Sequence, residues 1–552
     1  MFPYAVEHFT AEEQDVLRRY VTNLDRPVFA LVNLPEVVKG ALFARYSRSP
    51  KSLRRLFLDE FVDELDISGD ASVDATVGMR RAVDLYERVF NEYGDDSGAQ
   101  LGGVHLACEQ CSNLLTKVLE WGRLMAYLEQ STRYIAYNNR LDTGHYRYYR
   151  DPAVLESQLG ARYVGGMDRM FDTYGQLLEE AQSFLSLRHP RAPGDTDIVH
   201  RRAVKAKALD AVRGLLPAGS LSNVGIFGTG QSYELLLLRL RVHPLPEARA
   251  YAEMMLEELR KVIPSFLQRV DRPDRGGAWS SYLERTGAET ARVVGEFFPD
   301  LVAAPERPPS GPSGRPSVTL VDFDPEGEEK VLTAICAPLL GCSEEEVAGR
   351  VARLGAEERR VLLAAYVGER TNRRHRPGRA FERTSYRFEV VSDYGAFRDL
   401  QRHRMLTIEW QPLGSALGYD VPEVVEEAGL TSRFVASVDR SRELHDALRP
   451  HFPSQCAYAL ALAFRVRYSM QMNAREAMHL IELRSGSQGH PAYRWVAQEM
   501  HRLIAEAAGH RLLAEAMSHV DTDAAELGRI GAERRAEERR NPMSVAGNPL
   551  RS

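Results

Sequence analysis

The sequence predicts an α+β protein built from two similar units in one chain. The runs "VTLVDF" (318–323) and "TSYRFEVV" (384–391) alternate apolar and polar residues, as strands do, whereas most other segments carry apolar residues at intervals of three and four, as amphipathic helices do. Blocks of the first half also recur in the second half, which indicates a duplication. A length of 552 residues is more than one ordinary core accommodates, in agreement with at least two units.

The strand prediction depends on which side chains share a face. In the second run Tyr386, Phe388 and Val390 fall on one face, and Arg387 and Glu389 fall on the other. This pattern is typical of a strand with one buried face and one exposed face.

Two long apolar stripes predict core-facing helices. The first stripe lies between residues 167 and 184 and the second between 495 and 504; their members are Met167, Met170, Phe171, Tyr174, Leu177, Leu178, Ala181 and Phe184, and Trp495, Val496, Met500, Leu503 and Ile504.

Composition divides the chain into four parts. Residues 304–316 are rich in Pro, Gly and Ser and predict an extended linker between a first repeat at 1–303 and a second repeat at 317–515. Residues 516–552 end in a charged stretch without an apolar stripe, so we expect a disordered tail or a frayed helix.

The repeats align through two anchors. Trp121, Gly122 and Arg123 correspond to residues 402–404, an offset of 281 residues, and Arg213 corresponds to Ala457, an offset of 244 residues. The first half therefore carries 37 extra residues between about 141 and 200. We interpret the chain as a diverged tandem duplication.

Charge and hydropathy exclude several classes of protein. A net charge of -6 argues against a nucleic-acid scaffold, and a mean hydropathy of -0.34, with no apolar leader at the N-terminus, argues against a membrane bundle. Five cysteines are too few and odd in number for a disulfide framework, so we expect a cytoplasmic protein.

Four local motifs leave alternatives open. Cys108 and Cys111 form a CxxC that reads more readily as two buried thiols than as a metal or redox site, and His105 and Glu109 have the spacing of metal ligands but no evident third ligand. The basic run "RRHRPGR" (373–379) is either a solvated loop or an anion site for a phosphorylated small molecule. The Gly-rich "GIFGTG" (225–230) lacks the context of a Rossmann motif.

Both repeats resemble the flavin-dependent thymidylate synthases. That family carries the signature RHRxxSxNExSxRY and, further along, a segment of the form NARxxxHFIxLR. The second repeat has "RHRMLTIEW" (402–410) and "MNAREAMHLIELR" (472–484), and the first repeat has "EQSTRY" (129–134). The resemblance implies two tandem units, each with a small, mostly antiparallel sheet flanked by helices and related to the other by a pseudo-twofold axis.

The two repeats have lost complementary parts of this pattern. The first repeat carries Trp121, Gly122 and Leu128 at signature positions, and the second carries Trp410, Pro412, Gly414 and Ala457. In the family the active site forms between subunits of a tetramer, so the resemblance implies one composite site per chain that draws on both repeats. A homodimer of the fused chain would rebuild the tetramer.

The resemblance assigns roles to the retained residues. FAD binding falls to Arg402, His403, Arg404, Asn473, Arg475, His479 and Glu129, and nucleotide binding falls to Glu129, Gln130, Ser131, Arg133, Arg213 and Arg484. Arg484 is also the expected catalytic residue, since it would polarise the pyrimidine base, and no metal site is expected. Independently of the family, clustered guanidinium groups are suited to phosphates, because arginine binds oxyanions bidentately.

The implied reaction is reductive methylation of dUMP to dTMP. NADPH would reduce FAD, methylenetetrahydrofolate would give the one-carbon unit, and the flavin would supply the reducing equivalents. Because both signatures are incomplete, two alternatives stay open. One is a flavin-less homologue with an assembly or regulatory role, and the other is a related enzyme that acts on another pyrimidine nucleotide.

Overall fold

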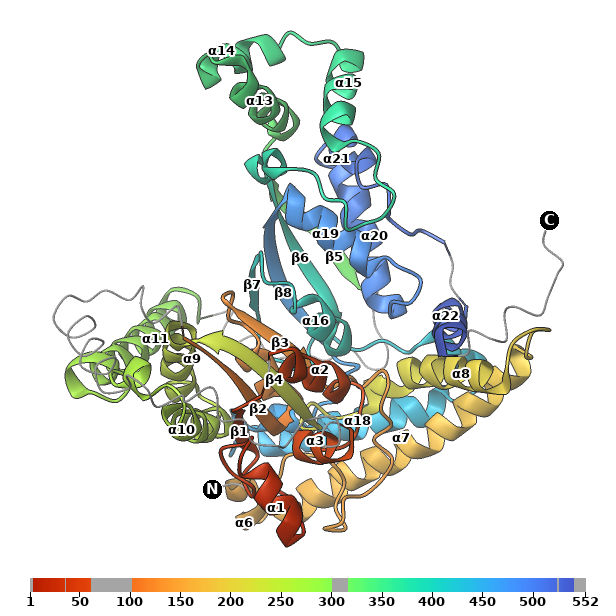
Figure 1. Ribbon diagram of the computed structural model, residues 1–552. Helices are drawn as coiled ribbons and strands as arrows, with labels where there is room; N and C mark the ends of the chain where they lie inside the picture. The colour runs from red at the N-terminus through yellow and green to blue at the C-terminus, as the bar shows by residue number, and fades with distance from the viewer. Residues whose placement is uncertain (1–2, 35, 61–101, 300–315, 524–525, 541–552) are drawn as a thin grey trace. The chain divides into compact units, whose positions relative to one another are not determined.

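The computed structural model describes residues 3–34, 36–60, 102–299, 316–523 and 526–540. Two four-stranded antiparallel sheets with the same topology dominate it (Figure 1). The first sheet has the order β1-β2-β4-β3, and the second has the order β5-β6-β8-β7. The strands are β1 (Val28–Leu31), β2 (Gly103–Ser112), β3 (Met125–Glu129), β4 (Leu221–Thr229), β5 (Ser317–Phe323), β6 (Ser385–Asp393), β7 (Thr407–Trp410) and β8 (Arg465–Asn473).

Helices fill the connections between the strands. Those of the first repeat are α1 (Ala11–Leu17), α2 (Glu36–Tyr46), α3 (Leu53–Glu60), α5 (Asn113–Leu119), α6 (Pro152–Glu156), α7 (Gly160–Arg188), α8 (Asp197–Val212), α9 (Gly230–Arg241), α10 (Pro246–Arg260) and α11 (Ala278–Phe297). The later ones are α13 (Gly327–Leu340), α14 (Glu344–Val351), α15 (Ala356–Val367), α16 (Tyr394–Leu400), α17 (Glu423–Glu427), α18 (Thr431–Leu448), α19 (Ala474–Arg484), α20 (Pro491–Glu506), α21 (Arg511–Glu515) and α22 (Ile530–Arg540).

Equivalent strands lead into equivalent helices, which confirms the duplication. Thr229 at the end of β4 and Asn473 at the end of β8 are N-caps, and each accepts a hydrogen bond from the backbone N–H three residues on. Ser112 and Asp393 cap α5 and α16 in the same way. Between β3 and β4 the chain forms α6, α7 and α8, whereas between β7 and β8 it forms only α17 and α18, and this difference accounts for the extra residues of the first half.

The compact units do not follow the two halves of the sequence. Unit 1 comprises Met1–Asp172, Leu216–Glu306 and Arg440–Leu460, and unit 2 comprises Thr173–Leu215, Arg307–Asp439 and Ala461–Ser552. Each unit thus contains one sheet together with a segment from the other repeat. The boundaries fall within α7 and α18, so the predicted domain limits at 303 and 317 describe the repeats but not the units.

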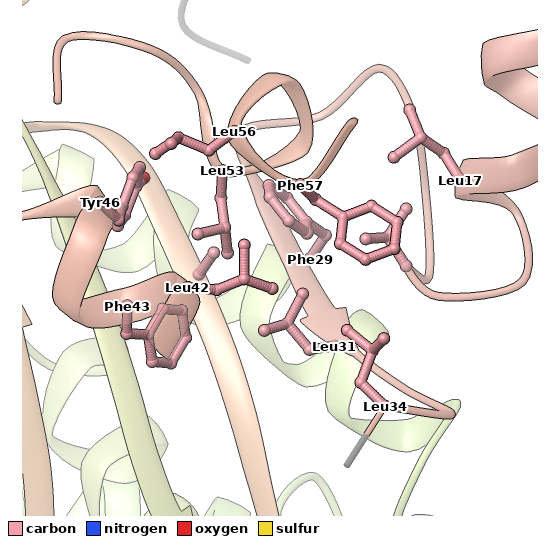
Figure 2. Close-up of a cluster of buried hydrophobic side chains, with 12 residues drawn as sticks. Leu17, Phe29, Leu31, Leu34, Leu42, Phe43, Tyr46, Leu53, Leu56 and Phe57 are labelled. Carbon is pink, nitrogen blue, oxygen red and sulfur yellow. The ribbon is translucent and has the colours of Figure 1, made fainter. Parts of the chain in front are cut away.

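The apolar core of each unit packs against its sheet, and in unit 1 all four residues of β1 are buried, so both faces of the strand are covered. In unit 1 the side chains of β1, α1, α2 and α3 meet in an apolar cluster (Figure 2) whose members include Leu17, Phe29, Leu31, Leu42, Phe43, Leu53, Leu56 and Phe57. In unit 2 the predicted inward face of β6, namely Tyr386, Phe388 and Val390, is fully buried, and α20 packs against β5 and β6. Burying such side chains stabilises each fold by roughly 1.5–3 kcal/mol per residue.

The first helical stripe is confirmed, and the second is confirmed in part. Every member of the first stripe except the half-buried Phe184 is buried in α7. In α20 Val496, Met500 and Ile504 are buried, but Leu503 is half-buried and Trp495 is exposed. None of the helices in the described ranges is both long and apolar enough to cross a bilayer.

The structure bears on the expected tail but on almost none of the expected linker. The linker expected at 304–316 lies, apart from Pro316, outside the described residues. Within the expected disordered tail the structure differs, because residues 530–540 form α22. Its Arg534 pairs with Asp195 at 2.5 Å, and its Glu537 accepts a hydrogen bond from Thr196 at 2.6 Å, so partners distant in the sequence order this charged stretch.

Candidate active site

The second-repeat motifs meet at two strand–helix junctions of unit 2. Residues 402–404 form the turn that joins α16 to β7, and Asn473 ends β8 where α19 begins. Arg475 and His479 lie in the first half of α19, and Arg484 is its last residue. Because β7 and β8 are paired neighbours, the structure brings both motifs to one edge of the sheet.

His403 is the buried centre of this site. Its Nδ1 lies 2.9 Å from Glu476 Oε1, and its Nε2 lies 3.0 Å from Arg484 Nε. A guanidinium N–H can only donate, so Nε2 is the acceptor and Nδ1 carries the proton that it donates to Glu476. Burial, together with the charges of Arg484 and Arg376, lowers the pKa of His403 well below its usual value. His403 is therefore a neutral imidazole that orients Arg484.

Arg484 is held from a second direction as well. Its guanidinium carbon lies 5.5 Å from the centre of the Tyr493 ring, within the range of a cation–π contact. The predicted catalytic arginine thus lies between an imidazole and an aromatic ring, which restricts its orientation.

His479 is paired with the basic segment 373–379. Arg376 Nη2 lies 3.0 Å from His479 Nδ1, and Arg475 Nε donates to the Pro377 carbonyl at 3.0 Å. Burial is the main cause that lowers the pKa of His479 to about 4. Of the two interpretations of this segment, the geometry favours the anion site, because Arg376 contacts the site residue His479.

Four arginines act on the His403–Glu476 pair, and we call them the cationic cluster. They are Arg376, Arg404, Arg475 and Arg484. Burial raises the pKa of Glu476, and the positive charges around it oppose that rise. Glu476 and Glu382, whose Oε1 lies 3.5 Å from Arg475 Nη1, are two carboxylates against four guanidinium groups, so this region favours an anionic ligand.

The same residues are a poor metal site. Ligand atoms of His403, Glu476 and His479 lie within 4.8 Å of one another, close enough to share an ion. However, both ring nitrogens of His403 already have partners, and the cationic cluster would repel a metal ion. The donor set therefore fits a polyanionic cofactor such as FAD better than a metal.

Arg213 also belongs to unit 2, although it comes from the first repeat. Its Nη1 lies 3.1 Å from Asp399 Oδ2, and Arg402 Nη1 lies 3.8 Å from Asp399 Oδ1. A second carboxylate, Asp393, lies 3.9 Å from Arg213 Nη2. Burial raises the pKa of Asp393 to about 6 against the opposing effect of Arg213. Residues of both repeats thus pair directly within one unit.

The remaining predicted nucleotide ligands belong to unit 1. Glu129, at the end of β3, is buried, and its Oε2 lies 3.1 Å from Lys117 Nζ, which is also 2.5 Å from Glu120. The Glu129 carboxylate therefore already has a buried counterion. Sequence reasoning missed Lys117, because an apolar helix such as α5 gives no sign that a lysine on it is buried.

Gln130, Ser131 and Arg133 follow β3 in a loop. Gln130 Nε2 donates to the Ser49 carbonyl at 2.6 Å, and Gln130 also lines a cavity of about 300 Å³ in unit 1. Ser131 Oγ accepts the Arg133 backbone N–H at 3.2 Å. These contacts order the loop but leave the predicted nucleotide-binding role untested.

Unit 1 retains only part of the arginine pattern at the corresponding positions that the structure describes. The two offsets place Trp121, Gln231 and Leu240 where unit 2 has Arg402, Arg475 and Arg484, whereas Arg123 corresponds to Arg404. Trp121 is 40% exposed, and its ring lies 5.2 Å from the Arg239 guanidinium. Three arginine positions of the second repeat have therefore been replaced in the first.

The minor motifs have structural roles. Cys108 and Cys111 are buried in β2, where burial raises the pKa of both thiols, so the interpretation as buried thiols holds. Glu109 accepts hydrogen bonds from the Tyr46 hydroxyl and the Leu53 backbone N–H. Residues 225–229 of the Gly-rich motif lie within β4.

Comparisons with known proteins point in one direction. The family described as thymidylate synthase complementing protein matches residues 42–265 and 319–508. A UPF0159 protein of Chlamydia muridarum is 36% identical over 534 residues, covering 96% of this chain and 98% of that protein. A UPF0159 protein of Thermoplasma acidophilum is 31% identical over 529 residues, covering 90% of this chain and 97% of that protein.

The chain also shows a loose similarity to a solved structure. The crystal structure of a UMP/dUMP methylase PolB from Streptomyces cacaoi bound with 5-Br dUMP is 18% identical and covers 38% of this chain and 97% of that chain, with a TM-score of 0.32. That superposition is too loose to support an inference about this chain.

Proposed function

Because the chain belongs to the thymidylate synthase complementing protein family as a double-length member, we propose that it methylates dUMP to dTMP. The observation that carries the proposal is the cationic cluster around neutral His403 and the carboxylate of its partner Glu476. Four guanidinium groups there face two carboxylates, Glu476 and Glu382, and this excess of positive charge suits an anionic cofactor and substrate.

FAD is the cofactor that we propose for this cluster. Arg402, Arg404, Asn473 and Arg475 would bind its phosphates and polar edges, and bound FAD would supply the reducing equivalents delivered by NADPH. Methylenetetrahydrofolate would supply the one-carbon unit. The donor set supports this choice, since guanidinium and amide groups can satisfy a diphosphate without a metal ion.

We propose that the residues of the chain act by positioning rather than by covalent attack. His403 keeps its proton on Nδ1 because Glu476 accepts it, and Nε2 then holds the Arg484 N–H. An arginine fixed in this way can stabilise negative charge that develops on the pyrimidine carbonyl. Loss of the His403 contact would leave Arg484 with more orientations and reduce that stabilisation.

The proposed site is composite. Within unit 2 the pair between Arg213 of the first repeat and Asp399 of the second repeat supports this view. Ser131 and Arg133 belong to unit 1, so their contribution to the same site stays a prediction.

One observation favours the non-catalytic alternative. The Glu129 carboxylate, which the resemblance assigns to both ligands, is buried against Lys117 and therefore has a counterion without any ligand. A chain in which Glu129 is only structural could retain the fold and serve as an assembly or regulatory protein.

Absorbance of the purified protein and a coupled assay separate the two functions. We expect a flavin spectrum, and dTMP formation that requires both NADPH and methylenetetrahydrofolate. Arg402→Ala should remove the flavin, whereas Arg133→Ala should weaken dUMP binding and leave the flavin bound. A colourless protein that binds neither FAD nor dUMP would contradict the enzyme proposal and favour the regulatory one.

A further inference from the structure

Asp399 is a buried carboxylate shared by two arginines that have different predicted ligands. Its Oδ2 accepts a hydrogen bond from Arg213 Nη1 at 3.1 Å, and its Oδ1 lies 3.8 Å from Arg402 Nη1. Arg213 is assigned to the nucleotide and Arg402 to the flavin. A single side chain therefore contacts both predicted half-sites.

The Asp399 carboxylate compensates the positive charges of the Arg213 and Arg402 guanidinium groups. Arg213 is 3% exposed and Asp399 is 8% exposed, so water screens their interaction poorly. Asp393 also lies 3.9 Å from Arg213 Nη2, so two carboxylates hold the two guanidinium groups in place. Without Asp399 the two positive charges would lie close together with less compensation, and both side chains would tend to move apart.

The structure also leaves one edge of Arg213 available for hydrogen bonding. Asp399 accepts a hydrogen bond from Arg213 Nη1, whereas Arg213 Nε and Nη2 have no hydrogen-bond partner among the residues that the structure describes. Arg213 lines a cavity of about 320 Å³ in unit 2, together with Lys207 and the carboxylates of Asp210, Asp393, Asp420 and Glu423. Its buried Nε–Nη2 edge has the geometry that binds an oxyanion bidentately.

Gly395 makes room for this arrangement. A Cβ at residue 395 would lie 3.1 Å from Arg213 Nε and 3.2 Å from Arg213 Cζ, closer than side chains normally approach. Any side chain at this position of α16 would push the Arg213 guanidinium away from its place beside Asp399.

We propose that Asp399 is a positioning residue that couples nucleotide binding to flavin binding. It fixes the Arg213 guanidinium for the nucleotide and the Arg402 guanidinium for the flavin, so that a change in one arginine alters the other. This inference rests on the proposed function, because it takes FAD and dUMP as the ligands.

The test compares two aspartates of unit 2. Asp399→Asn should weaken both FAD and dUMP binding by about tenfold or more, since charge-assisted hydrogen bonds are about twice as strong as neutral ones. Asp324→Asn is the control, because Asp324 pairs with Lys330 and belongs to neither predicted half-site; it should change FAD affinity by less than about twofold. Flavin fluorescence titration and calorimetry with dUMP measure the two affinities.

A double-mutant comparison distinguishes coupling from a general loss of structure. Arg213→Ala should change FAD affinity severalfold in the wild-type background and have no further effect in the Asp399→Asn background. If Asp399→Asn does not fold, Gly395→Ala provides a second route, because it displaces Arg213 and leaves Asp399 in place. Gly395→Ala should weaken dUMP binding and change FAD affinity.

The outcomes separate the two proposals. If wild-type protein binds FAD and dUMP but neither Asp399→Asn nor Gly395→Ala changes both affinities, the coupling role of Asp399 is wrong and the proposed function stands. If wild-type protein binds neither ligand, the proposed function fails first and the coupling role fails with it.

Discussion

Replacing two arginines of the cationic cluster by the residues that unit 1 carries should weaken flavin binding. Unit 1 has Gln231 and Leu240 where unit 2 has Arg475 and Arg484, so the double variant Arg475→Gln/Arg484→Leu copies a natural replacement. Of the two, Arg475 is the predicted flavin ligand, and loss of its charge-assisted hydrogen bond to a flavin oxyanion costs about 1.5–3 kcal/mol. A loss of that size weakens binding by about tenfold to 100-fold.

The structure identifies further consequences of each change. Arg484→Leu removes the donor to His403 Nε2, and Arg475→Gln removes the hydrogen bond from Nε to the Pro377 carbonyl. The expected loss is therefore a lower estimate, because His403 and the basic segment also lose their partners. Titration of the flavin-free protein with FAD, followed by flavin fluorescence, measures the effect.

Arg502→Gln is the matched control for this experiment. Arg502 lies exposed on α20 of the same unit, where it pairs with Glu499 and Glu506. Exposed ion pairs contribute about 0–1 kcal/mol, so this variant should fold and bind FAD like the wild type. Wild-type affinity in the double variant would refute the assignment of the cationic cluster to the flavin.

Four further predictions follow from the structure. Only unit 2 retains the cluster, so absorbance should give one FAD per chain at saturation; a ratio near two would contradict the single composite site. Burial raises the pKa of Asp393 to about 6, so ionisation of Asp393 lowers the stability of the fold as the pH rises from about 4 through 6. Asp393→Asn keeps the side-chain oxygen that accepts the Ala396 N–H, and it should raise the free energy of unfolding by roughly 3 kcal/mol at pH 8 and by little at pH 4. Melting experiments at both pH values measure this difference. Phe29→Ala removes a fully buried ring from the core of unit 1 and should cost about 3–5 kcal/mol in chemical denaturation; a cost under about 1 kcal/mol would mean that the cluster of Figure 2 is not a core. Helix α11 has no buried residue and exposes Trp279 and Phe297, which supports the expected homodimer, so light scattering at micromolar concentration should give twice the chain mass, and a monomer would count against it.

Local patterns were enough to predict the strands β5 and β6 and the helices α7 and α20, whereas the two antiparallel sheets were expected from the family resemblance. The alternation of β6 and the stripe of α7 report directly which side chains are buried, and both predictions are confirmed. The motifs also identified most of the cluster, although Glu476 and Arg376 were found only from the structure. Glu476 follows Arg475 inside the motif at 472–484, and Arg376 lies in the basic run at 373–379, for which the sequence left an anion site open. The sequence therefore indicated the segments that carry both residues, but not the residues themselves.

Two features could not be predicted from local patterns. Burial of Lys117 beside Glu129 depends on which elements cover α5, and a sequence window does not contain that information. The assignment of 173–215 to unit 2 depends on which sheet a helix packs against, because an amphipathic stripe shows only that a helix packs, not its partner.

The reciprocal placement of 173–215 and 440–460 restricts how this chain can be divided. A cut between the repeats, at the Pro- and Gly-rich segment, would leave each fragment without a helical segment that belongs to its own compact unit. Neither fragment expressed alone would then contain all the residues of one unit. Production of both fragments in the same cell would be needed to rebuild the protein, and gene fission at this point would convert one polypeptide into an obligate pair of subunits.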